Sequence, residues 1–483
     1  MPPPIATAVY TCLILFLFYL NRHSQRQTSK ALWLPVTWLL INGSRPISFW
    51  LNPGVPDSAE QLLEGSPLDR AIYLSVFAAG LIVLFRRRTT VARFLHANSA
   101  ILVFVLYCAV SITWSDYPLV AFKRWIKFVG DFVMVLIILT DTYRFHTVRR
   151  VFARVAFVLI PLSVLVIKYF PELGRQYDTW EGTQHFCGLA TDKNMLGMTC
   201  LVYGLGIWWQ FIALYSDKKG PERLKRLLPH AVVLTMVFWI FWIADSMTSL
   251  SCFIIASGLI VVTTFSKKAR KPATLHLLVA AILSVSFSVL FLQVGGGALE
   301  TMGRNPTLTG RTEIWAHLIQ LSANPVVGTG FESFWLGERL QRIWATSQYL
   351  FGINEAHNGF LEVFLNLGWV GVILFTVLLV AGYRNVLVTL RKDPDAGRLK
   401  LALFVAAVVY SFTEAAFRTM APIWTAFLLA ITAVPEASSS PHVLSMPAIS
   451  VVETRKLTSN YPNGRLVESG RVPPCLAAPR FNR

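Results

Sequence analysis

The most constraining feature of this chain is a series of apolar blocks, separated by short polar stretches, that recurs along most of its length. The blocks hold roughly 16 to 22 residues, the length of a helix that crosses a hydrocarbon core of about 30 Å. Hydrophobic residues make up 54% of the 483 positions and charged residues only 14%. The pattern excludes an ordinary soluble enzyme and predicts an all-α polytopic membrane protein.

We expect about 12 to 13 transmembrane helices from these blocks. The first block is expected to be a membrane anchor and not a cleaved signal peptide, because its positive charges follow it. The candidate spans are 5–20, 31–50, 71–85, 95–113, 125–140, 151–170, 194–215, 230–244, 249–265, 275–294, 360–382, 401–417 and 421–434.

Spans and loops divide the chain into four predicted parts. They are an N-terminal transmembrane bundle of about ten spans (1–294), a long periplasmic loop (295–359), C-terminal spans (360–434) and a disordered cytoplasmic tail (435–483). In the loop, apolar residues recur at helical spacing over 309–319, and a second amphipathic stretch covers about 337–350. We expect both helices to lie on the outer bilayer surface.

The net charge of +18 is concentrated in short loops between spans. Of the 44 Lys and Arg residues, 24 lie in 21–30, 86–94, 141–150, 216–229, 266–272 and 384–400. The positive-inside rule assigns these loops, and the C-terminus, to the cytoplasm. The basic excess is therefore explained by topology, and a nucleic-acid partner is not expected.

Several kinds of site are missing from the sequence. It has no Walker motif, no HExxH and no CxxC pair, so direct use of ATP is not expected. Asp393-Pro394-Asp395 has the spacing of a metal-binding DxD, but in a short basic loop a turn is the better interpretation. We predict neither a metal site nor a cofactor.

A first candidate site is Gly310 with Arg311 in the long loop. A site for a diphosphate needs fixed cations, and an arginine can contact two phosphate oxygens at once. Gly310 lets a headgroup approach the backbone, and the helix that follows presents amide groups that favour anions. The alternative is an interfacial arginine that snorkels toward lipid headgroups.

A second candidate site is His357, where the long loop re-enters the membrane. A histidine there can take a proton from a sugar hydroxyl near neutral pH. Asn358 and Glu362 share a helix face with Asn366, which gives a polar stripe in an apolar span. The alternative is a helix-capping or surface histidine.

A third candidate site is Lys193 with Asn194, at the external end of a span. Lys193 can act as a point-charge phosphate ligand, or it can be an interfacial lysine without a function. Two further pairs, each four residues apart, are expected to be structural ion pairs: Lys127 with Asp131, and Glu414 with Arg418.

The order of the motifs resembles the O-antigen ligase and polymerase superfamily. The series is Gly310-Arg311-Thr312-Glu313-Ile314-Trp315, Asn324-Pro325-Val326-Val327-Gly328-Thr329-Gly330-Phe331, Ala356-His357-Asn358 and Leu367-Gly368-Trp369-Val370-Gly371. The segments Gly188–Gly197 and Asp116–Asp141 look more like the exopolysaccharide polymerase branch than the lipopolysaccharide ligases.

This resemblance implies a glycosyltransferase of the bacterial inner membrane that uses an undecaprenyl-diphosphate-linked oligosaccharide donor at the periplasmic face. It implies that Arg311 holds the donor diphosphate and that His357 activates the acceptor hydroxyl. The ligases have one more essential arginine in an earlier external loop. The corresponding region of this chain has Arg175, His185 and Lys193, and Lys193 is preferred for that contact.

The leading hypothesis is a polymerase that joins lipid-linked repeat units by a metal-independent, inverting transfer, with a chain-length regulator and a flippase as partners. The nearest alternative is a ligase that transfers the finished glycan to lipid A core with the same residues. A further alternative is a lipid-linked oligosaccharide flippase or another transporter, which needs a polar pathway through the membrane.

Overall fold

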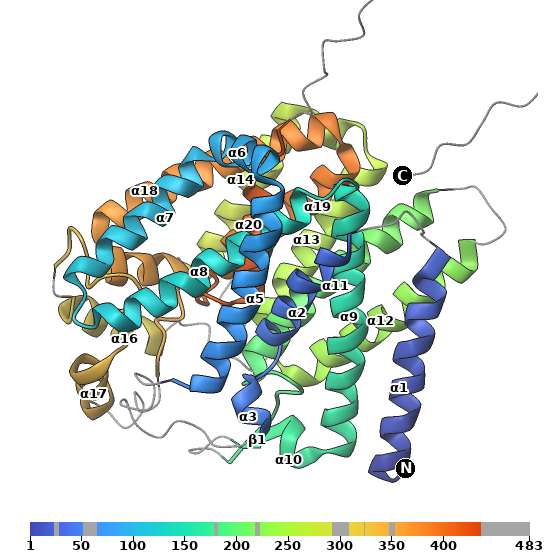
Figure 1. Ribbon diagram of the computed structural model, residues 1–483, viewed down its shortest axis with the longest axis horizontal. Helices are drawn as coiled ribbons and strands as arrows, with labels where there is room; N and C mark the ends of the chain where they lie inside the picture. Colours follow the sequence, from blue (N-terminus) through green and yellow to red (C-terminus); the bar gives the residue numbers. More distant parts are fainter. Residues whose placement is uncertain are drawn as a thin grey trace, which may run out of the picture. The chain divides into compact units, whose positions relative to one another are not determined.

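The computed structural model describes residues 1–23, 29–51, 65–177, 182–217, 223–291, 309–322, 324–346 and 353–435 (Figure 1). The described chain is almost entirely helical. Its helices are α1 (Pro3–Leu20), α2 (Trp33–Asn42), α3 (Ile47–Leu51), α5 (Pro67–Arg86), α6 (Arg88–Ala97), α7 (Ser99–Val110), α8 (Pro118–Leu139), α9 (Arg144–Tyr169), α10 (Pro171–Gly174), α11 (Lys193–Ser216), α12 (Arg223–Ala244), α13 (Met247–Phe265), α14 (Pro272–Phe291), α16 (Thr309–Gln320), α17 (Gly337–Thr346), α18 (Gly359–Lys392), α19 (Pro394–Tyr410) and α20 (Pro422–Ile431).

Short 3₁₀ turns and one small sheet complete the described elements. The turns are η1 (Asn21–His23), η2 (Lys30–Leu32), η3 (Ser111–Trp114) and η4 (Lys268–Arg270). Strands β1 (Arg175–Tyr177) and β2 (Gln184–Phe186) pair antiparallel, with Gln176 opposite His185.

Eight of the described helices are long and apolar enough to cross a membrane: α1, α5, α9, α11, α12, α13, α14 and α18. A ninth crossing results if α6 and α7–η3, which meet at an 88° bend, count as one span. The chain is therefore an all-α polytopic membrane protein, as the apolar blocks predict. The expected 12 to 13 spans exceed the number of described helices that meet these criteria.

The difference between the expected number of spans and the number of described helices that meet these criteria has local causes. The predicted span 31–50 divides into α2 and α3, of 10 and 5 residues, which are too short to cross a bilayer. α8, which contains predicted span 125–140, carries Lys123, Arg124, Lys127 and Asp131. α19 and α20, in place of the last two predicted spans, hold 17 and 10 residues.

The helices differ strongly in how much of their surface other helices cover. α9 and α11 are the most enclosed of the eight, and α11 contacts α9, α12, α13, α19 and α20. α1, α5 and α14 keep most of their residues uncovered, and α1 lies along α9 at the edge of the bundle (Figure 1). A helix that is apolar on all sides and enclosed in this way forms the bundle interior.

α18 is broken at Gly368, which has a φ of +62°. A Cβ atom on Gly368 would lie 2.3 Å from the backbone carbon of Val326, so only glycine fits this close approach. The segment 324–331 runs along the break. Its Thr329 and Gly330 amides donate to the carbonyl oxygens of α18 residues before the break, at 3.2 and 2.9 Å.

Backbone groups beyond the break are paired as well. The Trp369 and Val370 amides donate to the Pro325 and Val326 carbonyl oxygens, at 2.9 and 3.1 Å. The motifs around Gly328 and Gly368 therefore face each other. The segment 324–331 supplies hydrogen-bond partners for the backbone groups of α18 that the break would otherwise leave unpaired in the membrane.

The long loop has a small apolar core of its own. The described buried members are Leu318 of α16, Leu340 and Ile343 of α17, Phe334, Trp335, Ala356 and Leu365. The two helices expected near 309–319 and 337–350 thus correspond to α16 and α17, and their apolar faces pack on the start of α18. The predicted tail, from residue 436 onward, lies outside the described residues.

Candidate functional site

His357 lies in the short connection before α18, with a φ of +47°. Asn358 caps the helix: its Oδ1 accepts the amides of Phe360 and Leu361, each at 3.0 Å. The Asn358 Nδ2 donates to the Phe412 carbonyl oxygen at 3.3 Å. The backbone around His357 is thereby held against the irregular segment 411–421 that joins α19 to α20.

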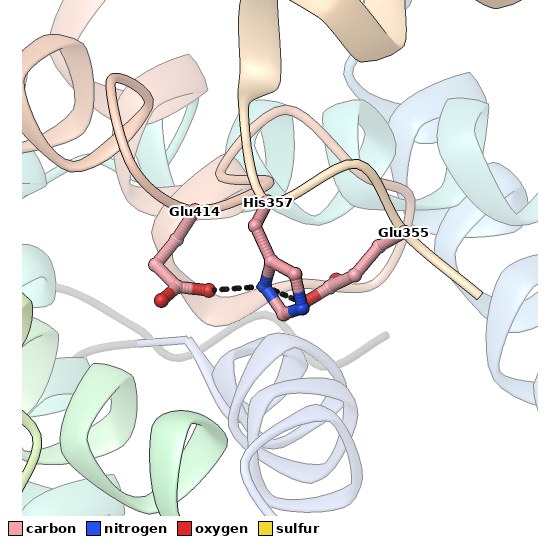
Figure 2. Close-up of side chains that lie close together, drawn as sticks. All are labelled: Glu355, His357 and Glu414. Carbon is pink, nitrogen blue, oxygen red and sulfur yellow. Dashed lines mark hydrogen bonds and ion pairs between the residues drawn. The ribbon is translucent and has the colours of Figure 1, made fainter. Parts of the chain in front are cut away.

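Two carboxylates bind the imidazole of His357 (Figure 2). Its Nδ1 lies 3.0 Å from Glu414 Oε2 and 3.1 Å from Glu355 Oε1. Arg418 adds a second cation, because its guanidinium donates to Glu355 Oε2 at 2.7 Å. The Glu414 side chain is only 7% exposed, whereas that of His357 is 28% exposed and accessible to a substrate.

The charges in this cluster stabilise one another. Burial disfavours the imidazolium, but the hydrogen bonds and charges of Glu355 and Glu414 outweigh it and raise the pKa of His357 to about 10. Burial likewise disfavours the Glu355 carboxylate, but the His357 hydrogen bond and the Arg418 charge lower its pKa to about 2. At neutral pH the cluster therefore holds an imidazolium and an ionised Glu355.

Glu362, one turn into α18, is buried beside this cluster. Its carboxylate accepts the Trp335 indole Nε1 at 3.0 Å and the Ala356 amide at 2.6 Å. Asn366, a turn further, accepts the Ser333 amide at 2.9 Å. Glu362 and Asn366 thus lie one turn apart on α18, as the predicted polar stripe requires, and they bind the segment 331–336, whereas Asn358 precedes the helix as its cap.

A cavity of about 110 Å³ opens beside Arg418. Its polar lining comes from Arg124, Glu332, Trp335, Asn354, Glu362, Asn366 and Arg418, and its apolar lining from Phe104, Phe128, Phe331, Val363, Leu367 and Phe417. Acidic, basic and aromatic groups that converge on one hollow can bind a hydroxyl-rich ring through hydrogen bonds and stacking.

One wall of this cavity is formed by Arg124 and Glu332, which lie 208 positions apart in the sequence and bind each other. Arg124 of α8 donates to the Glu332 carbonyl oxygen at 2.6 Å and lies 3.9 Å from its carboxylate. The Glu332 Oε1 in turn accepts the Thr419 amide at 3.1 Å. No spacing in the sequence links Arg124 to Glu332, so sequence reasoning missed both residues.

Two expected ion pairs do not form within the described residues. Glu414 binds His357 and Arg418 binds Glu355. Helix α19 ends at Tyr410, so residues four apart beyond it no longer share a helix face. Asp131 accepts the Trp38 indole at 2.7 Å and further donors from α2 and from the segment around Met420. Lys127 lies over the Tyr73 ring, 5.0 Å from its centroid.

The loop candidates Gly310 and Arg311 occupy the first turn of α16, and the side chain of Arg311 lies outside the described part of the structure. One turn further along this helix, the Trp315 indole donates to the Ala356 carbonyl oxygen at 2.7 Å. Ala356 directly precedes His357. The start of α16 is therefore attached to the connection that carries the histidine.

The remaining candidates lie in the earlier external segment. Lys193 and Asn194 begin α11, where Asp192 caps the helix by accepting the Asn194 and Met195 amides at 2.9 Å each. Arg175 of β1 donates to the Ile167 carbonyl oxygen at 3.1 Å and stacks on the Phe186 ring. None of these three contacts His357 in the described structure.

A metal ion could be considered at Glu355, His357 and Glu414, whose donor atoms lie within 4.8 Å of one another. The position between the carboxylates is, however, taken by the imidazole Nδ1, and Arg418 contacts Glu355. Two protein cations thus neutralise two carboxylates. The donor set fits a proton-carrying cluster better than a divalent ion.

Parts of the chain are similar to known proteins. Residues 230–376 match a protein family described as O-antigen ligase. The exopolysaccharide production protein ExoQ of Rhizobium meliloti (strain 1021) is 26% identical over 312 residues, which cover 61% of this chain and 67% of that protein. The matched family region includes α16, His357 and the break in α18. Over these regions the chain is similar to O-antigen ligase and exopolysaccharide production proteins, in agreement with the resemblance of its motifs.

Proposed function

We propose that this protein is a polymerase that joins lipid-diphosphate-linked oligosaccharide repeat units into an exopolysaccharide or O-antigen. The observation that carries the proposal is the cluster that His357 forms with Glu355 and Glu414 just before α18. His357 and Glu355 lie inside the region that matches the O-antigen ligase family, and Glu414 lies beyond it. The similarity to a protein named for exopolysaccharide production favours a polymerase.

In this proposal the donor diphosphate binds at the N-terminal turn of α16. Position 311 lies four residues before Trp315, on the same helix face, and Trp315 is hydrogen-bonded to the residue before His357. A diphosphate there would meet the N-terminal amides of the helix and the Arg311 guanidinium beside Gly310. Lys193 and Asn194 are proposed as further contacts. Arg175 is the weaker candidate because it is already hydrogen-bonded.

The acceptor hydroxyl is proposed to lose its proton to the cluster of Glu355, His357 and Glu414. Because His357 is an imidazolium, it cannot accept a further proton by itself. Glu355, whose pKa is lowered to about 2, is a poor proton acceptor, so the proton is proposed to pass to the Glu414 carboxylate while the imidazolium keeps its own proton. The hydroxyl oxygen attacks the anomeric carbon from the face opposite the diphosphate. The new glycosidic bond forms as the bond to the lipid diphosphate breaks, and configuration inverts.

The cavity beside Arg418 is proposed to hold a sugar ring of the acceptor. Glu362 and Asn366 supply hydrogen-bond acceptors, and Trp335 with its aromatic neighbours supplies an apolar wall. Asn358 is proposed to position the connection that presents His357. The lipid diphosphate is itself a good leaving group, so the transfer needs neither a nucleotide nor a metal ion.

The proposed setting is the bacterial inner membrane, with the loop 295–359 at the periplasmic face and the tail from 435 in the cytoplasm. The four-part division of the chain follows from this arrangement. A flippase that delivers the donor and a chain-length regulator are the proposed partners.

A ligase that transfers glycan to lipid A core is the second candidate, supported by the description of the matched family. Purified protein in nanodiscs, given only lipid-diphosphate-linked repeat units and a chelator, distinguishes the two when products are read by mass. A ladder of repeat multiples supports the polymerase. Transfer only after lipid A core is added supports the ligase, and no product in either assay would favour a transporter.

A further inference from the structure

A second cavity, of about 500 Å³, lies at the other end of α18 from His357. Its lining combines cations with apolar side chains: Lys267, Arg270, Lys271, Pro272, Leu275, Leu387, Leu390, Arg391 and Pro394. The part of α18 that follows the break at Gly368 is long enough to cross a hydrocarbon core of about 30 Å. The two cavities therefore face opposite sides of the membrane.

Within the described part of the chain, no acidic side chain lines the second cavity beside its cations. No carboxylate is among its lining residues, and the buried Nε of Arg270 has no hydrogen-bond partner in the described structure. Arg398 lies close enough to Arg270 to be repelled by it. The nearby carboxylates are already engaged: Asp395 pairs with Arg149 at 2.7 Å, and Asp393 caps α19.

The floor of the cavity is apolar. Leu275 in the first turn of α14 is 2% exposed, and Leu390 of α18 is 6% exposed. Beyond this floor α14 is largely uncovered: among its described residues only Leu275 and Val279 are buried, and Leu277 is 71% exposed. An occupant that uses the whole cavity must carry negative charge at one end and hydrocarbon at the other.

We propose that this cavity binds the headgroup of an anionic phospholipid, whose acyl chains lie along α14 and α18. Four cations, among them Arg270 with its buried Nε, would hold the phosphate, as basic pockets between transmembrane helices do on the cytoplasmic side. The leucine floor would contact the glycerol and the first methylenes. Free phosphate would use the cations but not the leucines, so the lipid is the occupant that fits the lining.

The test is the binding of fluorescently labelled phosphatidylglycerol to the full-length protein in neutral detergent, with phosphatidylcholine as the uncharged comparison. Wild type is expected to prefer phosphatidylglycerol. The double variant Arg270→Gln with Arg391→Gln should bind it roughly thirtyfold more weakly, since each lost cation contributes near a membrane surface. The charge-retaining variant Arg270→Lys with Arg391→Lys should keep most of the affinity. It shows that weaker binding of the glutamine variant comes from the lost charge and not from misfolding.

The matched control is Arg86→Gln with Arg88→Gln. It removes two exposed arginines that lie outside the cavity but on the same side of the membrane, the expected cytoplasmic side. An equal loss in this control would mean that general surface charge attracts the lipid, and it would overturn the proposal. Full displacement of the lipid by glycerol 3-phosphate, at concentrations similar to those of the lipid itself, would overturn the proposal as well. The cavity would then bind the phosphate alone, without any contribution from the acyl chains. Neither outcome bears on the glycosyl transfer proposed at His357.

Discussion

The Nδ1 nitrogen of His357 lies 3.0 Å from Glu414, which follows it by 57 residues, and 3.1 Å from Glu355, so one imidazole joins two carboxylates from separate segments. Glu355 comes from the end of the long loop, and Glu414 from the irregular segment after α19. The arrangement makes the proton affinity of this group a property of three residues together. The predictions below follow from that property and from the loop motifs that position it.

The pH dependence of glycosyl transfer should lack an inflection near 6.5, the ordinary value for histidine. With a pKa of about 10, His357 stays charged through neutral pH and loses its proton only in alkaline solution. Initial rates measured from pH 6 to pH 10.5 should therefore be flat near neutrality and change only toward the alkaline end. A rate that rises through pH 6.5 would show instead that a free imidazole acts as the base.

Glu355→Gln should lower the free energy of unfolding at pH 7 by on the order of 2 kcal/mol. The pKa of Glu355 is depressed to about 2, so its contribution is present above the unfolded value of 4.5 and is lost as the pH falls toward 2. Denaturation in detergent should accordingly show a difference from wild type that shrinks in acid. Glu338→Gln, an 82% exposed carboxylate on α17, is the control and should be neutral.

The fold could be predicted from the sequence to the extent that hydrophobic block length decides it. The α class, the long spans and the polar residues at the start of α18 follow from that pattern. The span count could not be predicted, because α2 and α20 lie inside the bundle as short apolar helices, and composition alone does not distinguish them from crossings.

The charge partners in the site were beyond sequence reasoning. Glu414 and Arg418 have helical spacing, yet the helix ends at Tyr410 and each side chain binds a residue of the loop instead. Arg124 meets Glu332 only because α8 and the segment 331–336 pack together in space. Long-range packing of this kind leaves no periodic signal in a single sequence.

Gly368→Ala should destabilise the protein by about 3 kcal/mol or more, since it adds a side chain at positive φ against the Val326 backbone. Gly258→Ala is the matched control. Gly258 lies within α13, and a Cβ there would meet nothing within 4 Å, so alanine should be neutral or stabilising. Thermal unfolding of both variants in the same detergent measures the difference; equal midpoints would contradict the close approach of the two motifs.

Arg311→Ala should abolish glycosyl transfer while the protein stays in the membrane, because the donor diphosphate loses its proposed contact. Arg311→Lys should restore little activity if the guanidinium binds two phosphate oxygens. Arg342→Ala removes a 71% exposed arginine from α17 in the same loop and should leave the rate unchanged. Full activity of the lysine variant would argue against two-point binding.

The central claim is tested most directly by the product ladder of the His357→Gln variant. Purified wild type, His357→Gln and His317→Gln receive the same lipid-diphosphate-linked repeat units, and the products are resolved by mass. His317 lies on the neighbouring helix α16, where its Nε2 meets Thr346 at 3.2 Å, away from the cluster. We expect a ladder from wild type and from His317→Gln but none from His357→Gln; a normal ladder from His357→Gln would remove this histidine from the mechanism.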